Sequence, residues 1–133
     1  MHISMKLAEL KPGDWVRIDD EGVNREGTVV RVSYEENEVN INNGIQEFWY
    51  SLDHVYGVPL DEGQLMRLGF ERKETGEGVK YGKGAFRLQV PAADNFSRIE
   101  IWYREDRRQF DHPLMVHELQ NLFLQMTKMH LEP

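Results

Sequence analysis

The segment PLMVHELQNLFLQMTKMHL, residues 113–131, gives the strongest indication of the fold of this chain. Pro113 suits the first turn of a helix, where its missing N–H costs nothing. Val116 and Phe123 add to an apolar stripe whose main members recur at intervals of four and three and therefore share one helix face. These are Met115, Leu119, Leu122, Met126 and Met129. The pattern predicts a long C-terminal helix that covers a sheet.

The size and charge of the chain narrow the protein classes to consider. With 133 residues it fits one compact domain or two very small ones. The net charge is −7, and 40% of the residues are hydrophobic, which is typical of a globular protein. Residues 1–60 hold 11 acidic and 5 basic residues, whereas residues 61–133 hold 12 and 11. An acidic first half repels phosphate and disfavours nucleic-acid binding through that half.

The sequence contains no cysteine, so disulfides, thiolate zinc sites and cysteine nucleophiles are excluded. The first residues lead to no apolar run of the signal-peptide type, and no stretch approaches the roughly 20 apolar residues of a membrane-spanning helix. We therefore expect a soluble cytoplasmic protein with no membrane partner.

Residues 1–59 carry the signals of a small β-barrel. Gly27–Tyr34 is rich in β-branched and aromatic residues, and Asn43-Gly44 is a strong hairpin signal. Ser51–His54 has the composition of a single helical turn. The predicted strands are residues 15–18, 27–34, 39–41, 45–50 and 55–58.

This arrangement of five short strands with a helical turn before the last resembles a Src homology 3-like barrel. Pro12–Arg17 and Gly27–Val32 also resemble the start of KOW-type barrels, which are common in translation and transcription proteins. The acidic loops depart from the basic face that a nucleic-acid-binding KOW barrel needs. The resemblance therefore implies a fold and leaves the function open.

The sequence pattern of residues 60–133 predicts an α+β unit, in which helices pack on one face of a small antiparallel sheet. Asp61 is placed to cap a short helix over residues 62–68, with Gly69 as its stop. Strands are expected over residues 70–74, 79–81, 85–90 and 98–104, followed by the C-terminal helix. The fold class is thus α+β, with a barrel over 1–59 and the second unit over 60–133.

A wider resemblance covers most of the chain. Val58–Asp61, Leu68–Glu71 and above all Val116–Phe123 resemble segments of a group of small proteins of unknown function. These occur in gut bacteria and in the phages and mobile elements that infect them. The resemblance implies an accessory role in a mobile element and no particular activity.

The titratable residues give no pattern of a catalytic or metal site. On the last helix, His112 and His117 are five residues apart and His117 and His130 thirteen apart, so none forms the same-face pair of a helical zinc site. The acidic runs at 19–21 and 35–38 lack the alternating ligands of a calcium loop and suit hairpin tips. We expect no metal, no cofactor and no catalytic residue.

One candidate surface lies on the C-terminal helix. At about 100° per residue, Leu124 falls about 180° and Leu131 about 160° from Met115. Leu124 is thus opposite the core stripe, beside His117 and Gln120. This face is interpreted as a contact with the barrel or with a second copy of the chain; the alternative is a lone exposed leucine.

Two further candidate surfaces are aromatic. In Phe48-Trp49-Tyr50 strand alternation turns at least one ring outward, where it binds a partner or packs between the two halves. Trp102 is predicted to face outward in one row with Arg98 and Arg104, near Arg107 and Arg108 and interrupted by acids. This row is the one candidate site for the stacking of single-stranded nucleic acid.

We interpret the sequence as a non-catalytic module that acts through an unidentified protein partner. The second interpretation is a nucleic-acid-associated protein that uses the arginine–tryptophan strand face. An enzyme of unknown class is the third.

Overall fold

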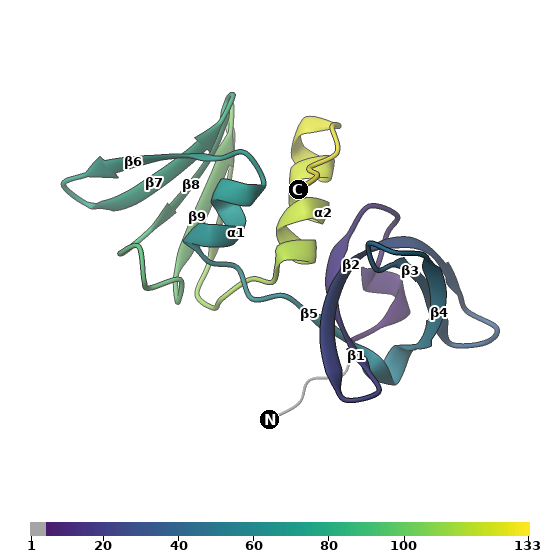
Figure 1. Cartoon of the computed structure of the whole chain (residues 1–133). Helices are drawn as coiled ribbons and strands as arrows, with labels where there is room; N and C mark the ends of the chain where they lie inside the picture. The colour runs from purple at the N-terminus through teal and green to yellow at the C-terminus, as the bar shows by residue number, and fades with distance from the viewer. Residues whose placement is uncertain (1–4) are drawn as a thin grey trace. The chain divides into compact units, whose positions relative to one another are not determined.

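The chain is an α+β protein built mainly from antiparallel β-sheet, as a computed structural model shows for residues 5–133, the part that the structure describes (Figure 1). Its residues group into two compact units. The first contains the chain up to Val58 together with Val116–Asn121, and the second contains Pro59–Met115 together with Leu122–Leu131. Each unit holds one five-stranded sheet.

The first sheet is a meander whose fifth strand returns beside the first. Its hydrogen-bonded order is β4-β3-β2-β1-β5, and all of its pairings are antiparallel. Short 3-10 helices, η1 and η2, precede β1 and β5. The elements are η1 (Leu7–Glu9), β1 (Trp15–Asp20), β2 (Val23–Ser33), β3 (Glu38–Asn42), β4 (Glu47–Ser51), η2 (Leu52–His54) and β5 (Val55–Gly57).

The first sheet curls around its core but does not close, so the small barrel predicted for residues 1–59 is corrected to an open sheet (Figure 1). β4 and β5 are its two edges. β5 ends at Gly57. The next carbonyl, that of Val58, accepts a hydrogen bond of 2.8 Å from the Val116 N–H and not from a strand of this sheet. The single helical turn predicted before the last strand is present as η2.

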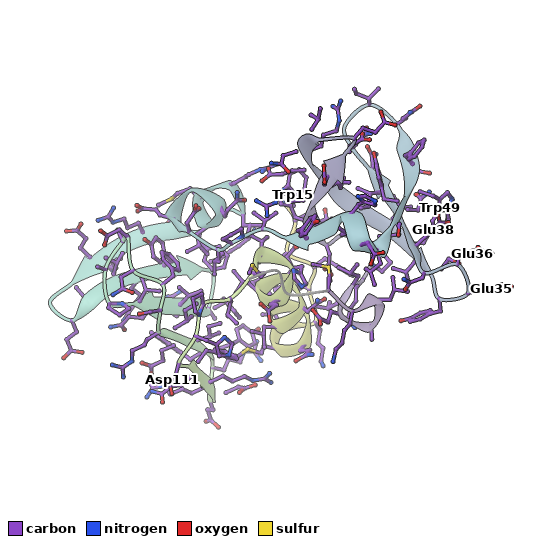
Figure 2. All side chains as sticks on the ribbon, turned by 90° about the horizontal axis from the view of Figure 1, so that it is seen from below. Trp15, Glu35, Glu36, Glu38, Trp49 and Asp111 are labelled. Carbon is purple, nitrogen blue, oxygen red and sulfur yellow. The ribbon has the colours of Figure 1, made fainter. Side chains whose placement is uncertain are left out.

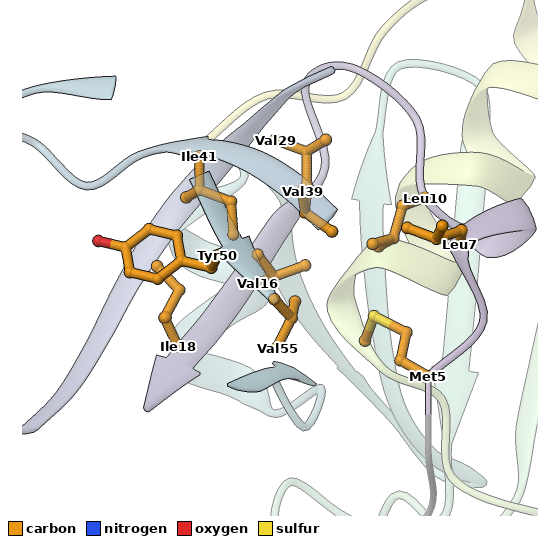
Figure 3. Close-up of a cluster of buried hydrophobic side chains, with 10 residues drawn as sticks. All are labelled: Met5, Leu7, Leu10, Val16, Ile18, Val29, Val39, Ile41, Tyr50 and Val55. Carbon is orange, nitrogen blue, oxygen red and sulfur yellow. The ribbon is translucent and has the colours of Figure 1, made fainter. Parts of the chain in front are cut away.

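All five strands and η1 contribute apolar side chains to the core of the first unit (Figure 3). Strand alternation directs every second side chain to this face, as Val16 and Ile18 in β1 illustrate. β2 passes close to β3 at Gly27, where an added Cβ would lie 2.5 Å from the Asn42 carbonyl oxygen. The core residues are Met5, Leu7, Leu10, Val16, Ile18, Val29, Val39, Ile41, Tyr50 and Val55.

The second sheet is a simple meander in the order β10-β9-β8-β7-β6. Its register places Trp102 directly between Arg87 on one side and Arg107 on the other. One short helix, α1, precedes it, and one longer helix, α2, follows it. The elements are α1 (Glu62–Arg67), β6 (Glu71–Thr75), β7 (Gly78–Lys83), β8 (Phe86–Val90), β9 (Ile99–Tyr103), β10 (Asp106–Phe110) and α2 (Val116–Thr127).

Helical side chains cover one face of the second sheet. Asp61 caps α1 as predicted, since its Oδ1 accepts a hydrogen bond of 2.9 Å from the Gln64 N–H. Phe86 of β8 is buried, and its ring centroid lies 4.8 Å from that of Phe123 in α2 and 6.0 Å from that of Phe70. Trp102 lies on the opposite face, because it alternates along β9 with the buried Ile101.

α2 is shorter than the helix predicted over residues 113–131. It begins late because residues before Val116 are extended: Pro59 and Met115 form a β-bridge, and the Leu60 N–H donates to the Leu114 carbonyl at 3.1 Å. It ends at Thr127 because Lys128 has a φ of 65°. Met129, predicted in the core stripe, is 55% exposed. In the described residues no helix is long and apolar enough to cross a membrane.

The first turns of α2 are joined to the start of β1 by hydrogen bonds within the first unit. Gln120 Oε1 accepts from the Trp15 N–H at 2.7 Å, and Gln120 Nε2 donates to the Gly13 carbonyl at 2.9 Å. Asn121 Nδ2 donates to the Glu9 carbonyl at 3.0 Å. These side chains satisfy backbone groups in η1 and at the start of β1, and buried backbone groups are costly to leave unpaired.

Replacing Gln120 should therefore destabilise the protein strongly. Gln120→Leu preserves the side-chain bulk but removes the acceptor of the Trp15 N–H and the donor to the Gly13 carbonyl. We expect the free energy of unfolding to fall by about 2 to 4 kcal/mol, measured by urea denaturation. The exposed Gln109→Leu is the matched control. Equal stability of the two variants would contradict this role of Gln120.

Candidate functional site

The edge strand β4 presents aromatic side chains to solvent. Phe48 is 52% exposed and Trp49 is 38% exposed, whereas Tyr50 is buried in the core of the first unit. The Phe48 ring packs on the Tyr50 ring with centroids 5.2 Å apart, so it extends the core to the rim. Ile45, in the hairpin before β4, is 83% exposed. The sequence thus located the aromatic triplet, and the structure shows which two rings are accessible.

Trp49 belongs to a cross-strand row on the outer face of the first sheet. Trp49 pairs with Asn40 in β3, and Asn40 pairs with Arg31 in β2. The Arg31 guanidinium reaches over this row to within 5.6 Å of the Trp49 ring centroid. Asn40 beneath them is buried. A cation–π contact of this kind holds the indole in place beside the strand edge.

Acidic side chains surround this aromatic edge. Glu47 lies within β4 and is exposed. Glu38 pairs with Ser51, the last residue of β4. Glu35 and Glu36 are exposed in the turn between β2 and β3 (Figure 2). The surface next to Trp49 therefore combines exposed aromatic rings with negative charge.

The outer face of the second sheet combines an aromatic ring with positive charge. Trp102 lies in a row between Arg87 and Arg107. Lys80 Nζ lies 5.1 Å from the Trp102 ring centroid, and the Arg107 guanidinium carbon lies 5.6 Å from it. Lys73 pairs directly with Lys80 across β6 and β7. We call Lys73, Lys80, Arg87, Trp102 and Arg107 the basic face.

A pocket of about 530 Å³ opens on the same part of the second sheet. Gly82 forms part of its lining, and the Arg87 guanidinium lies across this glycine, because an added Cβ would be 2.9 Å from Arg87 Nη1. Among the described residues that line the pocket, Glu71 alone is acidic. The basic lining residues are Arg72, Lys73, Lys80, Lys83 and Arg87.

The residues that surround Trp102 in the structure differ from those of the predicted arginine–tryptophan row. Arg107 is beside Trp102 as expected from the sequence, but Arg104 sits in the turn after β9, with its guanidinium 5.1 Å from the Tyr103 ring centroid. Arg98 lines a different pocket, with Glu77 and Asp111. Lys80 and Arg87 lie near Trp102 instead, because the sheet places β8 directly beside β9 and β7 on the far side of β8.

The candidate contact face on the C-terminal helix is mostly buried. His117 is 2% exposed and Gln120 is 4% exposed, because both side chains pack into the first unit. Leu131, placed on the same side by the helical wheel, is also buried, and Leu124 is half-buried. The helical wheel correctly separated His117 and Gln120 from the apolar stripe, but it did not show that both are buried.

The buried polar side chains of the first unit include one carboxyl group, Asp14. Burial raises the pKa of Asp14 to about 6 against the lowering effects of the Lys11 N–H, the charge of His117 and the Asn121 amide. Asp14 Oδ2 accepts from the Lys11 N–H at 2.9 Å and from Asn121 Nδ2 at 3.3 Å. His117 Nε2 lies 3.6 Å from a Glu9 carboxylate oxygen. This arrangement holds a turn and offers no access to a substrate.

Comparison with known proteins gives no guide to the function of the two surfaces described above. No protein-family model, no curated protein and no solved structure matches this chain. Within residues 5–133, no three histidine, aspartate or glutamate side chains are grouped so that they can hold a metal ion. The aromatic edge and the basic face are therefore the candidate sites that chemistry alone identifies.

The buried Asp14 should make stability depend on pH in a specific window. Its pKa is about 6 when folded and near 3.8 when exposed, so the folded state binds the proton more tightly. The stabilisation is complete below pH 3.8 and is lost as the pH rises to 6. Relative to Asp14→Asn, the wild type should lose about 2 to 3 kcal/mol across this window.

Urea denaturation of both proteins at several pH values measures this difference. The exposed Asp53→Asn serves as a control for the loss of one surface charge. Parallel stability curves for the wild type and Asp14→Asn between pH 4 and 7 would show that the burial of Asp14 has no energetic effect.

Proposed function

We propose that the protein is a non-catalytic interaction module that binds an extended peptide as an added strand along β4. The observation that carries the proposal is an edge strand with accessible aromatic side chains: β4 has one strand neighbour, β3, and exposes Phe48 and Trp49. Strand addition supplies main-chain hydrogen bonds, and side chains next to the edge supply specificity.

The other sheet edges are less suited to strand addition. β6 is exposed along its whole length and rich in charge, from Glu71 to Glu74, and charged side chains discourage pairing at an edge. β10 begins Asp106-Arg107-Arg108 and is protected in the same way. β5 has only three residues. β4 is therefore the edge whose side chains favour a partner strand.

The strand order of the first sheet supports the same proposal. We propose a Src homology 3-like arrangement for this unit, because a meander of four strands is followed by one helical turn and a fifth strand beside the first. Small β-barrels and related sheets bind peptides through exposed aromatic side chains. Trp49 and Phe48 have the exposure that such a role requires.

The charge around β4 defines the chemistry of the peptide. Glu47 in the strand and Glu38 opposite its end place carboxylates on the outer face of the edge. A peptide that alternates cationic and β-branched residues would direct its cations to these carboxylates and its apolar side chains to the Phe48 side. An acidic peptide would meet like charge.

A non-catalytic role fits the position of the perturbed carboxyl group. Asp14 has the raised pKa that often accompanies acid–base catalysis, but it is 3% exposed and is held by backbone and side-chain hydrogen bonds. A substrate in solvent does not reach it. Its surroundings explain its pKa without a reaction.

A fluorescently labelled Lys–Val alternating octapeptide tests the proposal by anisotropy. We expect it to bind the wild type and to bind Trp49→Thr at least about tenfold more weakly, because threonine suits a strand but removes the ring. Tyr34→Thr removes another exposed aromatic side chain, outside β4, and should bind as the wild type does.

Two further peptides sharpen this test. An octapeptide N-methylated at every residue keeps its side chains but has no N–H to donate along either edge, and it should not bind. A Glu–Val octapeptide should bind much more weakly than the Lys–Val peptide because of the glutamates around β4. Equal binding of the methylated and unmethylated Lys–Val peptides would overturn the strand-addition proposal.

A further inference from the structure

A second surface of the protein concentrates positive charge although the chain as a whole is acidic. The net charge is −7, yet the outer side chains of the second sheet include Lys73, Lys80, Arg87 and Arg107. The carboxylates on the same side are Glu71 and Glu100, and Glu100 is 3.1 Å from Arg107 Nε. The face thus retains a positive balance after its ion pair is counted.

Two cations of the basic face are available to a ligand. Among the described residues, neither Lys73 nor Lys80 is within ion-pair distance of a carboxylate. They are directly opposite each other across β6 and β7, and like charges at such positions destabilise a sheet. An anion bound between them would remove this repulsion. The two facing ammonium groups therefore form a favourable binding position for a phosphate.

The aromatic ring lies within reach of the same cations. Trp102 is half-exposed at the centre of the face, and the Lys80 ammonium and the Arg107 guanidinium both lie over its ring. Cation–π contacts at exposed sites are weak, so a flexible lysine can move to a phosphate when a base stacks on the indole. A ring and several cations at this spacing match a nucleotide strand, which offers flat bases and one charge per unit.

We propose that the basic face binds single-stranded nucleic acid. Bases stack on Trp102, and Lys73, Lys80 and Arg87 contact successive phosphates along the pocket that these three side chains line. A platform of this kind stacks unpaired bases and follows the backbone electrostatically. In a duplex the bases are already stacked on one another, so Trp102 would contribute nothing. This inference is independent of the peptide proposal, because it uses the other sheet and a ligand of opposite charge.

Fluorescence anisotropy with labelled oligothymidylate and oligouridylate of 12 residues, at 50 mM and 200 mM salt, tests the inference on the full chain. We expect wild-type binding to weaken as salt rises. Lys73→Gln/Lys80→Gln should bind at least about tenfold more weakly at 50 mM salt and lower the salt slope by about 1.4, or 0.7 for each phosphate that is no longer neutralised. The control is Lys6→Gln/Lys128→Gln, which changes the net charge equally outside the face and should bind as the wild type does.

Trp102→Ala distinguishes stacking from simple charge attraction. We expect about 5- to 100-fold weaker binding, with substantial recovery in Trp102→Phe. Circular dichroism verifies that each variant is folded; the lysine variants alter exposed or half-exposed side chains and test the face even if Trp102→Ala unfolds.

Three results would overturn the inference. The first is no wild-type binding of either oligonucleotide at 50 mM salt. The second is equal binding by the two double-lysine variants. The third is equal competition by a poly-glutamate peptide or a duplex of the same length, which would identify the face as a general polyanion site. Preference for one of the two oligonucleotides would support the inference and identify DNA or RNA as the ligand.

Discussion

The side-chain amide of Gln120 anchors the first unit through two hydrogen bonds, one accepted and one donated. They hold the backbone at Gly13 and Trp15, on either side of the buried Asp14, at the point where β1 begins. β1 is the strand between β2 and β5, so its position determines the register of half the sheet. A residue near the C-terminus thus fixes the start of the first strand. The burial of Asp14 is explained by the same structural task, because its carboxylate accepts from the Lys11 N–H and from Asn121 Nδ2.

The local signals in the sequence predicted much of the fold. Turn residues and alternation located most strands to within a few positions, Asp61 identified the start of α1, and Trp102 was correctly expected to face away from the buried side chains Ile99 and Ile101. These features depend on neighbours in the sequence. They follow from dihedral preferences and from the two-residue period of a strand.

The features that the sequence did not predict depend on distant contacts. The helix starts at Val116 rather than Pro113 because of the bridge between Met115 and Pro59. Lys80 and Arg87 replace Arg98 and Arg104 at Trp102 because β8 pairs with β9 and β7 with β8, in a register that periodicity alone does not give. His117 is buried near Glu9 of η1, over 100 residues away in the sequence, and a helical wheel includes no such distant neighbour.

The two proposed surfaces have opposite charge, and each belongs to a different sheet. The edge of β4 joins aromatic rings to carboxylates, whereas the basic face joins one ring to lysine and arginine. In both, a cation lies over a tryptophan, Arg31 over Trp49 and Lys80 over Trp102. Each ring therefore has a cation beside it, and the surrounding charge determines the ligand that we propose.

Hydrogen–deuterium exchange in the presence of the Lys–Val octapeptide tests most directly whether β4 is a peptide-binding edge. We expect new protection of amides in Glu47–Ser51, the residues of β4, because an added strand would bond the amides that point away from β3. Amides in β6 and β10 should exchange as they do without peptide. Protection that is absent from β4, or that is spread equally over the other edges, would contradict strand addition at this edge.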